Sequence, residues 1–123
     1  MRELTSHKVN GVNDGLIVTA ADEPGSGGAH HGYSIRWKNE RDKTEPRCYI
    51  GFQDGSIKEV GVNGVTHEAL LAIVIDRLQC FQKGPFACRE NAIALTKIEE
   101  AMHWLQHRTN ERLRRGVEGT MNK

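Results

Sequence analysis

The chain has 123 residues, of which 37% are hydrophobic and 27% charged, and its formal net charge is +1. This composition is typical of a soluble globular protein and predicts one domain over residues 1–123, while the near-neutral charge argues against bulk polyanion binding. Three cysteines without a CxxC pair, and no secretory signal, favour a reducing compartment. The longest strongly apolar stretch, residues 69–78, is too short to span a membrane.

The first half of the chain, residues 1–64, predicts a small antiparallel sheet. Short runs rich in β-branched and aromatic residues are separated by glycine-rich and charged segments. In one run, Tyr33, Ile35 and Trp37 alternate with Ser34 and Arg36, which is the pattern of a strand with one apolar face. Asp54-Gly55 predicts a hairpin turn. The predicted strands are residues 15–19, 33–37, 47–53 and 56–60, and residues 23–28 and Lys38–Pro46 are predicted loops.

The second half, residues 65–123, predicts two helices. Thr66 is a good N-cap for the first helix, and Gly84-Pro85 ends it. The second helix begins near Cys88 and meets no breaker before Gly116, so it is about 40 Å long. We expect its far end to pack on another subunit or to project outward. The predicted fold class is therefore α+β, a small antiparallel sheet followed by a two-helix hairpin with a long C-terminal helix.

Basic side chains concentrate at the end of the long helix. The last 23 residues hold five Lys or Arg against two Glu, a net charge of +3. Trp104, Arg108, Arg112 and Arg115 are spaced four, four and three residues apart, which places them on one side of a helix. Arginines bind phosphate bidentately and stack on bases. The alternative is a solvated helix end whose cations complement the helix dipole.

The segment that follows this helix is a second candidate site for an anion. Gly116 suits the left-handed residue after a helix, and a flexible loop can offer backbone N–H groups to a phosphate. The alternative is a plain helix stop with a frayed tail. The loop consists of Gly116, Val117, Glu118, Gly119 and Thr120.

Two further segments precede helix starts, where anions bind readily. At the joint between the helices, Phe81 and Phe86 flank the turn; an aromatic ring there can stack on a purine, and Asn91 can contact an adenine edge or cap the backbone. Alternatively, both phenylalanines are core residues that close the hairpin. Residues 61–66 contain Asn63 and lead to Thr66; the alternative there is a turn with an N-cap.

No catalytic set is recognisable. His30-His31 and the helical pair His103 and His107 lack further ligands at metal-binding spacing, so neither a metal nor another cofactor is predicted. A hydrolase or transferase is the least favoured class. A helix-turn-helix-like nucleic-acid-binding regulator is the alternative to a ligand-binding protein, and the near-neutral charge counts against it.

Several segments resemble the Thoeris anti-defence sponge family of phages. They are Ile57–Leu78, Gly84–Ala101, His103–Thr109 and Arg115–Thr120. The ending Arg-Thr…Arg-Gly-Val-x-Gly-Thr is also similar to the anti-CBASS cyclic-nucleotide sponge family. The charged segment Lys38–Pro46 departs from the pattern as an insertion.

The resemblance implies a non-enzymatic protein that binds glycocyclic ADP-ribose without cleaving it, in the cytoplasm of the infected bacterial host. It implies dimers that assemble into hexamers, cyclic di- or trinucleotides as further ligands, and neither membrane nor nucleic-acid polymer as partner. The residues it implies for the ligand are Phe81, Phe86, Asn91, Arg108, Arg112, Arg115, Gly116, Val117, Glu118, Gly119 and Thr120. Those proposed for a second site are Lys58, Asn63 and Thr66.

Overall fold

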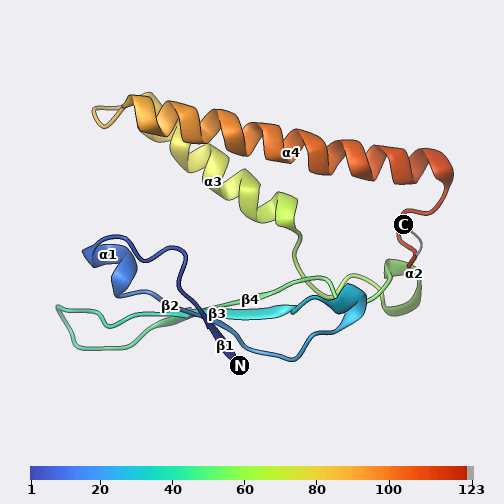
Figure 1. The fold of residues 1–123 in the computed structure, drawn as a ribbon, viewed down its shortest axis with the longest axis horizontal. Coiled ribbons are helices and arrows are strands. Elements are labelled where there is room, and N and C mark those ends of the chain that lie inside the picture. The colour runs from blue at the N-terminus through green and yellow to red at the C-terminus, as the bar shows by residue number, and fades with distance from the viewer. Residues whose placement is uncertain (122–123) are drawn as a thin grey trace. The chain divides into compact units, whose positions relative to one another are not determined.

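The structure is a computed structural model that describes residues 1–121. Two compact units divide the chain between them: residues 1–55 with 62–64, and residues 56–61 with the chain from Val65 onward. The first unit contains the strands and the second the long helices (Figure 1). The prediction of one domain stays a prediction.

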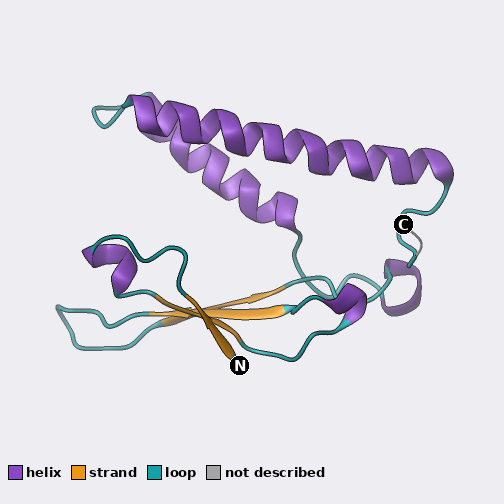
Figure 2. Cartoon of the chain, viewed as in Figure 1, coloured by secondary structure: helices purple, strands orange, loops and turns teal. Residues whose placement is uncertain are grey.

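The first unit is built on a four-stranded antiparallel sheet with the strand order β1-β2-β3-β4, as the sequence predicts in kind (Figure 2). Three of its strands match predicted segments, and β1 is an additional short strand. A short helix and a 3-10 turn interrupt the connections. The elements are β1 (Arg2–Leu4), α1 (Gly11–Asp14), β2 (Ile17–Ala20), η1 (Ser26–Gly28), β3 (Gly32–Arg36) and β4 (Arg47–Gly51).

The two faces of the sheet differ in polarity. Tyr33 pairs with Ala20 and Ile50 across the strands, and these apolar residues share one face. Among the described residues, Ala20 is the one fully buried hydrophobic side chain. Ser34 and Arg36 lie on the opposite face, which confirms the predicted alternation, although β3 ends before Trp37.

His31 and Asp22 fix the glycine-rich loop before β3. The Nδ1 of His31 lies 3.1 Å from the carbonyl oxygen of Gln53, and its Nε2 lies 3.0 Å from that of Ser26. The backbone N–H of His31 donates to the carboxylate of Asp22, and this hydrogen bond is the main cause that lowers the pKa of Asp22. The loop is therefore held at both ends by polar contacts.

The predicted strand at residues 56–60 is wrong. Ile57–Val60 form a short helix, α2, whose N-cap is Ser56; the Ser56 hydroxyl accepts a hydrogen bond from the Glu59 amide at 3.3 Å. Gly61 ends the helix at φ 73°, which is open to glycine but strained for other residues. The local cap outweighs the β preference of the branched side chains in this segment.

Two helices, α3 (His67–Gln82) and α4 (Arg89–Arg115), form the predicted hairpin (Figure 1). The predicted start of α3 is confirmed, because the Thr66 hydroxyl accepts a hydrogen bond from the Ala69 amide at 3.1 Å. The predicted end of α4 is also confirmed, with Gly116 left-handed at φ 75° and ψ 21°. Thr66 and Gly116 are thus caps that local sequence signals indicate, whereas the other two caps are Lys83 and Cys88.

The hairpin leaves large apolar side chains exposed. No side chain of α3 is buried, and the only buried one of α4 is Arg112. Ile73 of α3 is 66% exposed, and Trp104 of α4 is 65% exposed. Apolar surface of this kind is typical of a protein-interaction face. Within residues 1–121, no helix is both long and apolar enough to cross a membrane.

Candidate functional site

A hollow of about 580 Å³ lies at the joint between α3 and α4, a volume in the range of small-molecule pockets. Phe81 and Phe86 line it with ring centroids 6.3 Å apart and ring planes tilted by 55°. The guanidinium carbon of Arg77 lies 5.1 Å from the Phe81 ring centroid, a cation–π contact. Phe86 is 71% exposed, so it is not a core residue of this chain.

The turn that joins α3 to α4 is fixed by polar contacts that the sequence analysis missed. The Gln82 side chain donates to the carbonyl oxygen of Cys88 at 3.1 Å and accepts from its amide at 3.2 Å. Cys88 is the N-cap of α4, and its Sγ accepts a hydrogen bond from the Asn91 amide at 3.4 Å. Asn91 is therefore set in the first turn of α4 and half-buried, close in sequence to the hollow but not part of its lining.

At the opposite end of α4, Arg112 closes the C-terminal loop. Its side chain is 8% exposed, and its Nε donates to the Glu118 carboxylate at 3.1 Å. Its Nη2 donates to the carbonyl oxygens of Val117 and Thr120, both at 3.0 Å. The Thr120 hydroxyl donates to Val117 as well. The loop is consequently ordered by hydrogen bonds as far as Thr120, rather than frayed.

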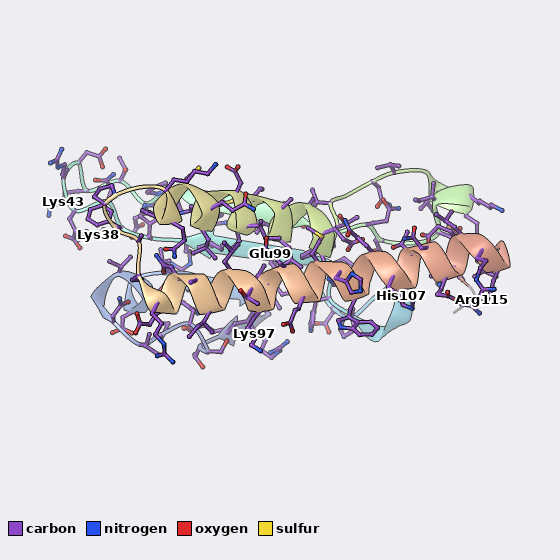
Figure 3. The ribbon with its side chains drawn as sticks, turned by 90° about the horizontal axis from the view of Figure 1, so that it is seen from above. Lys38, Lys43, Lys97, Glu99, His107 and Arg115 are labelled. Carbon is purple, nitrogen blue, oxygen red and sulfur yellow. The ribbon has the colours of Figure 1, made fainter. Side chains whose placement is uncertain are left out.

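The predicted basic face is therefore divided by burial. Arg108 and Arg115 are exposed, whereas Arg112 uses its guanidinium within the chain. Trp104 stands exposed one turn before Arg108, with the rings of His103 and His107 each 5.6 Å away and edge-on to it. Figure 3 labels His107 and Arg115 along this end of α4. Two exposed arginines and an exposed indole thus lie along this end of α4.

The residues predicted for a second site take separate roles. The backbone N–H of Lys58 donates to the carbonyl oxygen of Gly119 at 3.3 Å, so Lys58 lies beside the C-terminal loop. Thr66 caps α3. The Asn63 side chain accepts from the Asp54 amide at 2.9 Å and donates to the Asp54 carbonyl at 2.8 Å. It therefore connects two segments of the sheet unit.

Along α4, the predicted ligand residues fall into two groups. Asn91 and Arg112 lie at its two ends, 21 residues apart, which corresponds to about 30 Å at ~1.5 Å per residue. Phe81 and Phe86 belong to the joint at the start of α4. The loop that begins at Gly116 lies at the end of α4 (Figure 1). A ligand the size of a dinucleotide cannot contact both groups of one chain at once.

The described residues contain no group of three or more His, Cys, Asp or Glu side chains that could hold a metal ion. The groups that can bind a ligand are the aromatic rings at the joint, and the arginines and the ordered loop at the far end of α4. Arg77 and Gln82 were missed because the sequence analysis assigned neither side chain a role, although Arg77 lies in the family-like segment Ile57–Leu78. The spacing of Arg77 four residues before Phe81 was the available signal.

Comparison with known proteins places this hairpin among phage proteins. The Acb2/Tad1 hairpin domain matches residues 44–109. A protein of Bacillus phage SBSphiJ7 named Thoeris anti-defense 1 is 58% identical over 74 residues, which are 60% of this chain and 52% of that protein. The chain thus spans about half the length of this curated relative.

Proposed function

Because the chain belongs to the Acb2/Tad1 hairpin-domain family, we propose that it is a phage anti-defence protein that binds an immune signal and withholds it from its receptor. The proposed signal is glycocyclic ADP-ribose, with cyclic di- or trinucleotides as further ligands, and the blocked systems are Thoeris and CBASS. Binding is proposed to occur in the infected host cell without cleavage. The observation that carries this proposal is the 58% identity to Thoeris anti-defense 1.

The proposed pocket is shared between two copies of the chain. Phe81 and Asn91 at the joint are separated from Arg112 by about 30 Å of helix, so a single pocket requires the joint of one copy to meet the C-terminal end of the other. An isologous dimer forms two such pockets at once. The exposed apolar side chains of the hairpin, Ile73 and Trp104 among them, support an interface along these helices.

The chemistry of the two ends suits an adenine nucleotide with a diphosphate. At the joint, the adenine stacks on the Phe81 ring, which contributes about 1–3 kcal/mol. From the other copy, Arg108 and Arg115 bind the phosphates, and Arg112 positions the loop that closes around them. A sponge that competes with a receptor needs a nanomolar Kd, or about −12 kcal/mol, which a rigid shared pocket can reach.

Subunit complementation tests this arrangement. Phe81→Ala and Arg108→Ala are each expected to abolish binding of glycocyclic ADP-ribose. When the two variants are co-expressed in equal amounts, random pairing leaves about one quarter of the pockets with both wild-type residues. Calorimetry of the mixed oligomer should then recover about a quarter of the sites at wild-type affinity.

Lys97→Ala is the matched control, since Lys97 is exposed on α4 between the two ends (Figure 3). It should bind as the wild type does. If the mixed oligomer binds no ligand although both variants fold and assemble, the shared pocket is wrong. If Phe81→Ala alone binds normally, the joint is not part of the site.

A further inference from the structure

The β3–β4 hairpin, in the sheet unit, carries a second concentration of positive charge. Arg36 at the end of β3 is paired in register with Arg47 at the start of β4. Directly opposed residues on one face of a sheet have Cβ atoms about 4.5–5.5 Å apart, and like charges there are destabilising. A pair of this kind is stabilised when an anion lies between the two side chains.

No side chain among the described residues pairs with these two arginines. Within residues 1–121, neither the Arg36 nor the Arg47 side chain makes an ion pair or a hydrogen bond. Two acids of the adjoining loop are engaged locally, because Glu40 pairs with Lys43 at 3.7 Å and Asp42 accepts from the amide and hydroxyl of Thr44. Glu45 is an acid near the two guanidinium groups, and within residues 1–121 it makes no ion pair with either of them.

Both arginines line one hollow of about 210 Å³ at the loop end of this hairpin. Lys38 and Glu45 also line it, so its formal charge is +2, and Ile17 and Trp37 supply apolar wall. The hollow is smaller than the ~300–1,000 Å³ of pockets that enclose a drug-sized ligand, so it fits a single charged group better than a cyclic dinucleotide.

The loop above the hollow is ordered by its own backbone. The Asn39 amide donates to the Thr44 carbonyl at 2.7 Å, and the Lys43 amide donates to the Asn39 carbonyl at 2.8 Å. The Trp37 amide donates to the Pro46 carbonyl at 3.2 Å and extends the ladder past the arginine pair. Figure 3 labels Lys38 and Lys43 in this region. The hollow is thus held by fixed backbone on both sides.

From these observations we propose that the loop end of the β3–β4 hairpin is a phosphate-binding site. In it, the Arg36 and Arg47 guanidinium groups bind one phosphate group, and the Trp37 indole lies against the group that the phosphate carries. Planar guanidinium groups bind phosphate oxygens bidentately. An indole beside the phosphate favours a ligand with a flat ring, such as a nucleoside monophosphate, over free phosphate. This site is separate from the ligand pocket proposed above and does not depend on it.

The two indole N–H resonances of the intact protein provide the test, because Trp37 and Trp104 are its two tryptophans. The protein is titrated with AMP and, separately, with inorganic phosphate, and Trp37→Phe assigns the signals. Saturable movement of the Trp37 signal is expected with AMP. Movement with AMP at lower concentration than with phosphate identifies a nucleotide site, whereas equal response identifies a site for the phosphate group alone; either supports the proposal.

Variants separate this site from general charge. Arg36→Gln and Arg47→Gln should each weaken binding at least about tenfold. Arg41→Gln, in the same loop but outside the hollow, should not. Arg36→Lys keeps the charge and loses the planar fork, so its affinity should fall between wild type and Arg36→Gln. Failure of both probes to move Trp37, or an equal loss in Arg41→Gln, would overturn the proposal.

Discussion

Replacement of Arg112 with Gln should release the C-terminal loop from α4. The Arg112 side chain is 8% exposed, and its guanidinium bonds to the Glu118 carboxylate and to two loop carbonyl oxygens. Glutamine is too short to reach all three acceptors and carries no charge. The loop would then be held mainly by the backbone bond from the Val117 amide to the Arg112 carbonyl.

The free energy lost in Arg112→Gln can be estimated from the exposure of Arg112 and Glu118. Removal of one member of a buried ion pair costs about 3–5 kcal/mol. The Glu118 side chain is 34% exposed, so its carboxylate regains water when the loop opens and the cost falls to about 2–3 kcal/mol. This free energy appears as local opening of the loop, since α4 itself keeps its other contacts. It corresponds to a loss of amide protection of about 30- to 150-fold.

Amide hydrogen exchange measures this opening at two places. The Thr120 amide, which donates to the Val117 carbonyl, reports on the loop, and the Lys58 amide, which donates to Gly119, reports on α2. Both should lose protection together in Arg112→Gln. Arg114→Gln removes the same charge from an exposed side chain and should leave both unchanged. A change of less than about threefold in Arg112→Gln, or equal changes in the two variants, would show that Arg112 does not hold the loop.

Three further predictions concern stability. Gly64→Ala would place a Cβ atom 2.4 Å from the backbone of Phe52, so urea unfolding should show a loss of about 1–3 kcal/mol; an unchanged midpoint would contradict that contact. Folding lowers the pKa of Asp22 chiefly through the His31 amide, so the stability this carboxylate gives is complete above about pH 4 and is lost as pH falls through its lower folded value. The Tm of Asp22→Asn should therefore fall less between pH 7 and pH 3 than the Tm of the wild type. An equal fall in Tm would contradict this role of Asp22. Cys88→Ser replaces a weak sulfur acceptor with a preferred N-cap and should add about 0.5–1 kcal/mol in thermal unfolding, whereas a lower Tm would argue against the cap.

The helical half of the fold could be predicted closely because its boundaries are set by local chemistry. Thr66 and Gly116 act at the helix ends through their own hydroxyl and their own φ, and neither needs a distant partner. The sheet could be predicted in kind for a similar reason, since alternation between apolar and polar residues over 33–36 is visible in the sequence.

The errors arose where short segments depend on their surroundings. Residues 56–60 hold branched residues that favour β structure, yet Ser56 caps a helix that Gly61 ends one turn later. β1 was missed because it has three residues, too few for a periodic pattern. A single turn or a three-residue strand is decided by its contacts more than by its composition.

The predicted ligand residues stay a prediction, and the sequence did not reveal how they are arranged along the chain. Helical spacing correctly placed Arg108 and Arg112 on one side of α4, but spacing does not reveal that the loop after Gly116 folds back and buries Arg112. Motif resemblance also joined Phe81 to the C-terminal residues as one site. The length of α4 separates them within one chain, which is why we propose a pocket shared with a second copy.

The central claim, sequestration without cleavage, is tested most directly by recovery of the ligand. The purified protein is incubated with glycocyclic ADP-ribose, freed of unbound ligand and heat-denatured, and the supernatant is analysed by mass spectrometry. The account predicts near-stoichiometric recovery of ligand at its original mass. An empty supernatant would contradict binding, and a ligand of altered mass would contradict a non-enzymatic sponge.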